Sequence, residues 1–350
     1  MNLFRCDECG QLVHFENTSC ENCDAKLGFD WGSLDVVTLT TEATSSQYRE
    51  CENASHGVCN SVLIGETDGP LCFACRFTRT VPDLSVDDHL EHWREMEFAK
   101  RRLLYSLVRL HLPLTPKSED SEGGLAFDFL SDPADPEQPK VMTGHAEGVI
   151  TLNIAEADDA HRECTREEMG EPYRTLLGHM RHEVGHYFWD LLVRDAPALA
   201  RVREQFGDDT QDYADSLKRH YAQGSPADWR ERYVSEYASS HPWEDWAETW
   251  AHYLHMVGTL ETAHVFGLRV APKEDADGSL TSSVNVDPYT AEFDEWFGVW
   301  VPLTVAVNSL NRSMGQPDLY PFVTPPAVVE KLRTVHDIIR GNDPTNAPGA

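Results

Sequence analysis

Basic residues and long apolar runs are both scarce in this sequence of 350 residues. Lys and Arg total 29 against 59 Asp and Glu, so the formal net charge is −30 at pH 7. A field of that sign repels phosphate backbones and anionic lipid surfaces, which argues against a nucleic-acid or membrane partner. No stretch approaches the roughly 20 apolar residues of a membrane-spanning helix. The start, Met1–Cys6, also has no apolar segment typical of a signal peptide, so we expect a cytoplasmic protein.

Cysteine is nearly absent after residue 75, where Cys164 is the only one of the nine. The other eight lie between Cys6 and Cys75. Thiols stay reduced in a chain without a secretion signal, so clustered cysteines indicate metal ligands rather than disulfides. Cys164 has no neighbour of this kind, and we interpret it as an ordinary thiol.

The first four cysteines form two CxxC pairs, Cys6–Cys9 and Cys20–Cys23. Each CxxC turn directs two thiolates at one point, and two such turns complete the closed tetrahedral site of a structural Zn²⁺. Gly10 suits the φ > 0 position that ends such a turn. Two other interpretations stay open: four unrelated reduced thiols, or a redox CxxC, although no βαβ pattern surrounds either pair.

The second set of cysteines comprises Cys51, Cys59, Cys72 and Cys75, of which only the last two form a CxxC. We predict a second structural zinc site with four thiolate ligands. His56 could replace one thiolate, but we interpret it as an exposed loop residue. Residues 1–80 hold 5 Lys and Arg against 12 Asp and Glu. This predicted zinc-ribbon module is therefore expected to contact protein or to be purely structural, rather than to bind nucleic acid.

The rest of the chain, residues 81–350, has a mainly helical pattern with a small sheet. Helices are predicted over residues 87–112, 172–193, 197–206, 210–222, 239–256, 291–310 and 326–340, and strands over residues 126–130 and 148–154. The segment 113–138 is rich in Pro, Ser, Asp and Gly and is predicted to be a linker or long loop. We therefore predict an α+β fold, in which a ribbon module of residues 1–80 precedes a domain of residues 81–350.

An HExxH pattern, His182-Glu183-Val184-Gly185-His186, lies within the predicted helix 172–193. The two histidines are at positions i and i+4, so both imidazoles leave the same helix face and can bind one Zn²⁺, with Glu183 beside them to accept a proton from water. With this His and Glu content, chance would produce about 0.06 such patterns in the chain. The alternative is a polar helix face with two ordinary histidines.

A hydrolytic zinc site needs a third protein ligand and an open position for water. Glu244 and Glu248 are again at positions i and i+4 on one predicted helix, whereas Asp245 projects about 100° away. We predict Glu244 as the third ligand and Glu248 as the hydrogen-bond acceptor that fixes the tautomer of a ligand histidine. The reversed assignment stays open, as does a solvated acidic face with no metal.

Tyr237 and Asp190 are further candidates, each with a structural alternative. A phenol seven residues before Glu244 could donate a hydrogen bond to the oxyanion that forms when water attacks a carbonyl. From the residues alone, a buried structural tyrosine is equally consistent with this position. Asp190 lies four residues after His186 and could accept a hydrogen bond from that ligand.

Two long segments, EPYRTLLGHMRHEVGHYFWDLL (171–192) and SEYASSHPWEDWAETWAHYLH (235–255), follow the cysteine-rich ribbon. This combination closely resembles a family of bacterial zinc-ribbon proteins with a zinc-binding metallopeptidase domain. The spacing is also similar to that of gluzincin peptidases such as the protease domain of anthrax lethal factor. In that pattern the HExxH helix is followed by a Tyr and, seven residues later, by a ligand Glu within an E-x-x-A-E helix.

Tyr237, Glu244, Ala247 and Glu248 match the gluzincin pattern position by position. The resemblance implies Glu244 rather than Glu248 as the ligand, and Tyr237 as the group that stabilises the oxyanion. By analogy with related zincins, it also implies that residues 148–153 form the sheet edge on which a peptide lies.

These observations together predict a zincin-like metallopeptidase that binds one catalytic and two structural Zn²⁺ and acts on a protein or peptide. The ribbon would recognise a substrate or partner, or cover the cleft. A zinc-binding protein-interaction adaptor without catalytic activity is the main alternative, and a hydrolase of some non-peptide bond is the second. The sequence carries no information on the oligomeric state.

Overall fold

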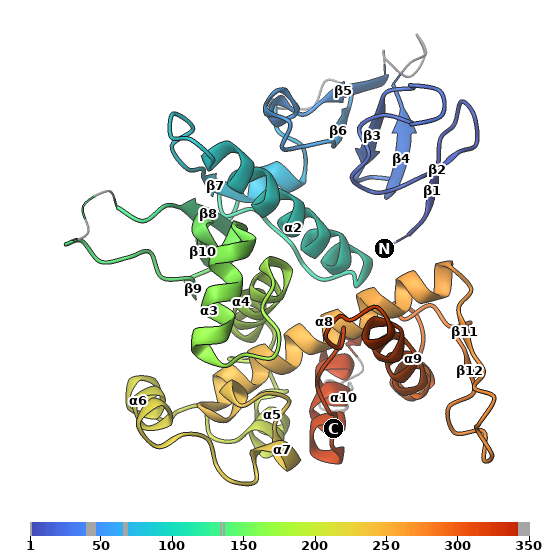
Figure 1. Cartoon of the computed structure of the whole chain (residues 1–350). Coiled ribbons are helices and arrows are strands. Elements are labelled where there is room, and N and C mark those ends of the chain that lie inside the picture. Colours follow the sequence, from blue (N-terminus) through green and yellow to red (C-terminus); the bar gives the residue numbers. More distant parts are fainter. Residues whose placement is uncertain (1, 40–46, 66–68, 134, 136, 342–350) are drawn as a thin grey trace. The chain divides into compact units, whose positions relative to one another are not determined.

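The computed structural model describes residues 2–39, 47–65, 69–133, 135 and 137–341 and divides into two compact units. Unit 1 comprises Met1–Gly170 with Arg174–Met180, and unit 2 comprises Glu171–Tyr173 with Arg181–Ala350. The fold is α+β and mainly helical, as the sequence predicts (Figure 1). Within the described ranges, no helix is both long and apolar enough to cross a membrane. The predicted division into residues 1–80 and 81–350 stays a prediction.

The cysteine-rich part of unit 1 consists of short antiparallel strand pairs joined by loops. The pairs are β1 (Phe4–Arg5) with β2 (Leu12–Val13), β3 (Leu27–Asp30) with β4 (Asp35–Thr38), and β5 (Tyr48–Glu50) with β6 (Val62–Ile64). Two 3-10 helices, η1 (Glu52–His56) and η2 (Ala74–Phe77), carry the chain around the second group of cysteines. Strands this short bury little apolar surface, so the region depends on other means of stabilisation.

The remainder of unit 1 contains a four-stranded sheet in the order β7-β8-β10-β9. Its strands are β7 (Thr78–Thr80), β8 (Ala126–Leu130), β9 (Gly144–Ala146) and β10 (Val149–Asn153). β7, β8 and β10 run parallel, whereas β9 is antiparallel to β10. The expectation that residues 148–153 form the sheet edge is therefore wrong, because β9 is the outermost strand. Glu147 (φ 48°) and Gly148 (φ 78°) reverse the chain in a tight hairpin that folds β9 onto β10.

Helix α2 (His89–Arg109) contributes side chains to the core of the cysteine-rich region. Tyr105 lies edge-on to Phe15 and Phe29, with ring centroids 5.6 and 6.3 Å apart. Arg101 is completely buried and donates a hydrogen bond to the side-chain oxygen of Asn60. Asn60 in turn donates to the carbonyl of Phe15 at 2.7 Å. The packing of the ribbon thus extends to a helix beyond residue 80.

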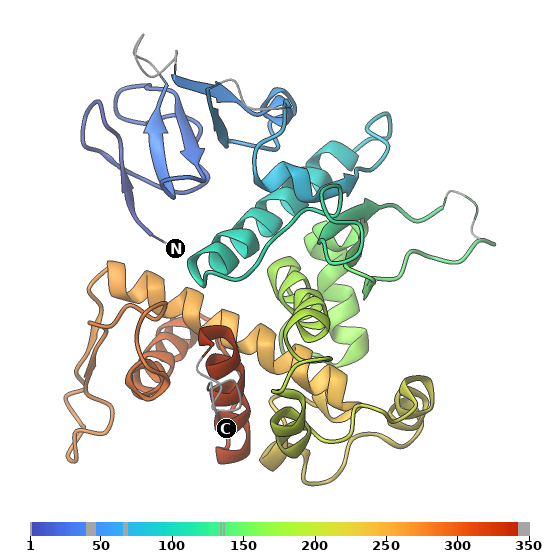
Figure 2. The same ribbon diagram turned by 180° about the vertical axis from the view of Figure 1, so that it is seen from behind.

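Unit 2 is a helical assembly around the long helix α8 (Pro242–Val265). The shorter elements before it are α5 (Leu199–Phe206), α6 (Tyr213–Gln223), α7 (Trp229–Arg232) and η4 (Tyr237–Ser239). After it come the strand pair β11 (Arg269–Val270) and β12 (Ser282–Ser283), then α9 (Phe293–Ser313) and α10 (Pro326–Arg340). Helices α9 and α10 both pack against α8. Figure 2 shows these three helices from behind. Large buried aromatic side chains fill this core: Trp246, Trp250, Tyr253 and Trp296.

Several helices differ from the sequence prediction, and three of them show the physical reason. Helix α4 (Leu176–Leu192) begins later than expected because the Thr175 hydroxyl accepts a hydrogen bond from the backbone N–H of Gly178 at 3.0 Å, which caps the helix there. Helix α8 continues beyond Met256 because apolar residues of the following turns are also buried. Helix α3 (Asp159–Met169) was not expected; it buries none of its residues and therefore has no apolar stripe to reveal it.

Candidate functional site

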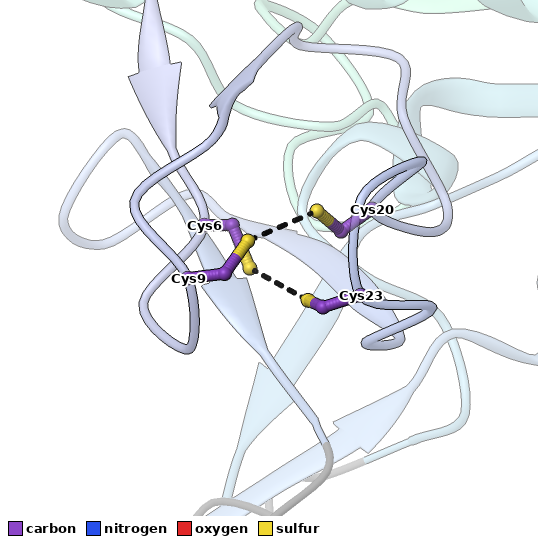
Figure 3. Close-up of side chains that lie close together, drawn as sticks. All are labelled: Cys6, Cys9, Cys20 and Cys23. Carbon is purple, nitrogen blue, oxygen red and sulfur yellow. Dashed lines mark hydrogen bonds between the residues drawn. The ribbon is translucent and has the colours of Figure 1, made fainter.

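The cysteines of the first CxxC pairs lie together in space, and Figure 3 shows their thiols pointing toward one another. The Sγ atoms of Cys6 and Cys23 are 3.7 Å apart, and those of Cys9 and Cys20 are 3.6 Å apart. These distances exclude disulfides, whose sulfur atoms lie about 2.05 Å apart. They match the edge of about 3.8 Å expected for a zinc tetrahedron with four thiolates. Gly10 takes the left-handed conformation that its place in the turn requires, with φ at 74°.

The second group of cysteines also converges, and all four of its members are buried: Cys51, Cys59, Cys72 and Cys75. The sulfur atoms of Cys59 and Cys72 are 3.7 Å apart. Backbone N–H groups point at two of the sulfurs, from Ser61 to Cys59 at 3.3 Å and from Cys72 to Cys51 at 3.4 Å. Such N–H groups stabilise thiolate charge. The chain therefore contains two four-cysteine sites that fit structural zinc.

Helices α4 and α8 approach closely at a point where both carry small residues. A Cβ atom on Gly185 would lie 3.0 Å from the Cα of Ala247 and 3.2 Å from the Cβ of Trp250. The indole N–H of Trp246 donates to the carbonyl of Gly185 at 2.9 Å. This close crossing brings the HExxH face of α4 against the first turns of α8.

The crossing gathers His182, His186 and Glu244 into one cluster, whose potential ligand atoms all lie within 4.8 Å of one another. The Oε2 atom of Glu244 is 3.0 Å from Nε2 of His182 and 3.5 Å from Nε2 of His186. The two Nε2 atoms are themselves 3.2 Å apart. Three ligands of a tetrahedral zinc ion with bonds near 2.1 Å would be about 3.4 Å apart, so the spacing fits that metal.

Glu248 lies on the other side of His182. Its Oε1 atom is 2.7 Å from Nδ1 of His182, and its Oε2 atom accepts a hydrogen bond from the Ser235 hydroxyl at 2.5 Å. The contact with Glu248 places a proton on Nδ1 of His182. In a neutral ring, Nε2 then has no proton, and its lone pair points at the carboxylate of Glu244. Two electron-rich atoms 3.0 Å apart repel each other unless a cation or proton lies between them. Glu244 thus faces the Nε2 atoms of both histidines, whereas Glu248 faces Nδ1 of His182.

Glu183 is 9% exposed and occupies the helix position next to the two histidine side chains. Burial raises the pKa of its carboxyl group, against the opposing effect of the nearby histidines. A carboxylate with a raised pKa is a stronger base, as proton transfer near neutral pH requires.

Two tyrosines lie at the site, and the sequence revealed only Tyr237. The Tyr237 ring centroid is 6.0 Å from that of His182, and burial raises the pKa of its hydroxyl. Tyr213 donates a hydrogen bond to Oε1 of Glu244 at 2.6 Å. Burial and the charge of Glu244 also raise the pKa of Tyr213, so its hydroxyl stays protonated. Neither Tyr213 nor Ser235 belongs to a spaced motif, and no sequence signal indicated them.

Asp190 forms an ion pair with Arg194 at 2.5 Å on the outer part of α4. Burial raises the pKa of Asp190, and the charges of Arg194 and His186 oppose that shift. A role for Asp190 in orienting His186 stays a prediction. Two further histidines of α8 have side-chain partners: His252 lies 2.7 Å from the hydroxyl of Tyr320, and His255 lies 2.6 Å from the guanidinium of Arg181.

The sequence matches two protein families, and together these matches span nearly the whole chain. Residues 89–338 match the family described as "Putative zinc-binding metallo-peptidase", and residues 3–86 match a zinc-ribbon domain family. The chain therefore belongs to this zinc-binding metallopeptidase family, and the resemblance to zinc-ribbon proteins with a metallopeptidase domain is confirmed.

Relatives of the whole chain occur in mycobacteria. An uncharacterised protein of Mycobacterium tuberculosis and one of Mycobacterium bovis are each 42% identical to this chain over 340 residues, which are 97% of this chain and 95% of each relative. No solved structure gives a significant match to the chain.

Proposed function

We propose that this protein is a zinc-dependent peptidase of the gluzincin type, in which His182, His186 and Glu244 hold the catalytic ion. The main support is the convergence of three electron-rich atoms, 3.0 to 3.5 Å apart, beside the buried carboxylate of Glu183. Zn²⁺ bound there would act as a Lewis acid toward a substrate carbonyl and toward water.

Glu183 moves the proton in the proposed reaction. As the oxygen of a water molecule bonds to the carbonyl carbon, the Glu183 carboxylate accepts one proton from that water. The protonated carboxyl group then delivers the proton to the amide nitrogen, and the C–N bond breaks to release an amine and a carboxylic acid. The raised pKa of Glu183 suits both transfers, because the group must first hold the proton and then release it.

Two neighbouring residues support this chemistry. The Tyr237 hydroxyl keeps its proton, since burial raises its pKa, and donates to the oxyanion that develops on the substrate. Glu248 accepts the Nδ1 proton of His182 and keeps Nε2 of that ring available as a ligand.

The two four-cysteine sites bind structural Zn²⁺, and the ribbon module recognises a substrate or partner or covers the cleft. The substrate is a protein or peptide. With a net charge of −30, the protein would attract basic polypeptides more strongly than acidic ones. The same charge would repel the phosphates of nucleic acids and anionic membranes, so neither is proposed as a partner.

Glu183→Gln tests the mechanism, because the amide keeps the shape of the carboxylate but cannot accept the proton. Hydrolysis of a broad peptide library by the variant should fall by about 100- to 10,000-fold. The zinc content should stay at three ions per chain, since Glu183 is not a ligand. Glu231→Gln, an exposed position on α7, is the matched control and should keep full activity.

Other outcomes would contradict the proposal in different ways. Full activity in Glu183→Gln would exclude Glu183 as the base. A wild-type protein that binds three zinc ions but cleaves no peptide in the library would instead be the non-catalytic zinc-binding adaptor.

A further inference from the structure

The two carboxylate oxygens of Glu244 have different partners. Oε2 faces the two histidines, 3.0 Å from Nε2 of His182 and 3.5 Å from Nε2 of His186. Oε1 accepts a hydrogen bond from the hydroxyl of Tyr213 at 2.6 Å. Glu244 itself is 1% exposed, so little solvent can compete for either oxygen. The two oxygens of Glu244 are therefore not equivalent: Oε2 faces the histidines, and Oε1 accepts the hydrogen bond from Tyr213.

The position of Tyr213 is set by contacts with the first turn of α8. Its ring lies edge-on to His241 and Trp243, with centroids 5.4 and 5.6 Å away. Nδ1 of His241 accepts a hydrogen bond from the backbone N–H of Trp243 at 3.0 Å, and Nε2 then carries the proton and donates it to the carbonyl of Gln211 at 3.2 Å. His241 therefore ties the chain just before Tyr213 to the turn that carries Glu244.

A free carboxylate can bind a metal ion through one oxygen or through both. If Oε1 of Glu244 also bound the ion, it would occupy a coordination position that a hydrolytic site keeps open for water and substrate. A hydrogen bond to Oε1 disfavours that arrangement and orients the carboxylate, and removal of such outer partners commonly weakens metal binding 10- to 100-fold.

We propose that Tyr213 is a positioning residue that holds Glu244 as a single-oxygen ligand of the catalytic zinc ion. The proposal deepens the peptidase function proposed above and rests on its zinc site. Tyr213 is assigned to Glu244 and Tyr237 to the substrate oxyanion, and because the two phenols also influence each other, the test measures metal binding without substrate.

Tyr213→Phe tests this role, since it removes the hydroxyl and keeps the ring contacts with His241 and Trp243. The probe is zinc alone, measured by competition with a chelator at the weakest of the three sites. We expect zinc affinity at that site to fall about 10- to 100-fold. Tyr48→Phe is the control, because it also removes only a phenol hydroxyl but lies on β5 in unit 1, and its affinity should equal that of the wild type.

Cobalt in the exchangeable site supplies a second measurement. A change from one to two bound carboxylate oxygens in Tyr213→Phe raises the coordination number, and this should weaken the visible absorption of the cobalt protein. Two measurements establish that Tyr213→Phe is folded. It should keep the two tightly held zinc ions, and its far-UV circular dichroism spectrum should be unchanged. An unchanged affinity together with an unchanged cobalt spectrum would overturn the role of Tyr213.

Failure of this proposal can be distinguished from failure of the proposed function, because metal binding is measured without any substrate. If the wild-type protein holds only two zinc ions, the zinc site and both proposals are wrong. If a third ion binds equally well to wild type and Tyr213→Phe and the two cobalt proteins have the same spectrum, only the positioning role is wrong.

Discussion

The four-cysteine sites and the His182–His186–Glu244 cluster both gather metal-ligating atoms, but different structures hold those atoms in place. Each cysteine site draws four thiols from short loops and turns within one stretch of sequence. The histidine cluster draws its three potential ligands from two long helices, α4 and α8, which cross at Gly185. Four thiolates close a tetrahedron, whereas three nitrogen and oxygen ligands leave a position for water or substrate.

This difference implies different relations between metal binding and folding. The strands of the ribbon are two to four residues long, so metal must supply stability that the apolar core cannot. The histidine cluster lies on helices that buried aromatic side chains already hold together, among them Trp246 and Trp250. We therefore expect zinc removal to unfold the ribbon and to leave α4 and α8 folded.

Cys75→Ser is expected to have the largest effect, because it breaks a site on which we expect folding to depend. Cys75 is fully buried in the second cysteine site. Structural zinc contributes about 10–16 kcal/mol to small zinc-dependent domains near neutral pH. The variant should lose one zinc ion per chain and the cooperative unfolding transition of the ribbon, as measured by metal analysis and calorimetry.

Two further variants complete this test. Cys164→Ser should change neither quantity, since Cys164 is exposed and belongs to neither cysteine site. His186→Ala should also lose one zinc ion but keep its helical circular dichroism spectrum. The contrast between the sites would be wrong if His186→Ala unfolded the protein while Cys75→Ser kept its transition.

The same contrast explains which parts of the site could be predicted from the sequence. CxxC and HExxH are local patterns, because a turn or one helix face alone directs both side chains to the same point. Tyr213 begins helix α6 and Ser235 lies just before η4, and their contacts with α8 depend on how these segments fold back, which no spacing in the sequence encodes. Glu244 was predictable because it combines a helical i, i+4 pattern with a resemblance to a known spacing.

The fold was predictable to a similar extent and for a similar reason. The strand at residues 126–130 and the helix at 326–340 begin and end as predicted, since apolar periodicity and Pro326 mark them. Helix α3 was missed because it buries no side chain, although Asp158 caps its start and Gly170 ends it. The sheet edge was wrong because pairing of β9 with β10 depends on a two-residue hairpin.

Lys331→Met is expected to have an intermediate effect, in unit 2 alone. The ammonium of Lys331 is 2.6 Å from Asp245, whose side chain is fully buried, and it also donates to the carbonyl of Arg232 at 2.7 Å. Removal of one partner of a buried ion pair commonly lowers the free energy of unfolding by about 3–5 kcal/mol, since the other charge stays buried. Calorimetry should show this loss in the transition of unit 2.

The matching change in unit 1 makes this test specific to one unit. Lys100 and Glu97 form an equally buried pair at 2.8 Å, so Lys100→Met should destabilise unit 1 instead. Lys218→Met, at an exposed position on α6, should affect neither unit. A loss of both transitions in either buried variant would mean that the two units unfold as one.

Gly185→Ala has the smallest expected effect on stability, and it acts on the histidine cluster by separating the two helices that carry it. The new methyl group would lie 3.0 Å from the backbone of Ala247, so α4 and α8 must separate by a few tenths of an ångström. Such overpacking commonly lowers the free energy of unfolding by about 1–3 kcal/mol. Because the three proposed ligands lie on both helices, zinc affinity at that cluster should fall while the four-cysteine sites keep their metal. Gly298→Ala is the control: its Cβ would meet nothing within 4 Å. It should stabilise α9 by about 0.5–1 kcal/mol, as alanine does in a helix. Chelator competition and thermal unfolding of the two variants would separate the close crossing at Gly185 from helix propensity, and equal zinc affinity in both would show that the crossing does not set the ligand geometry.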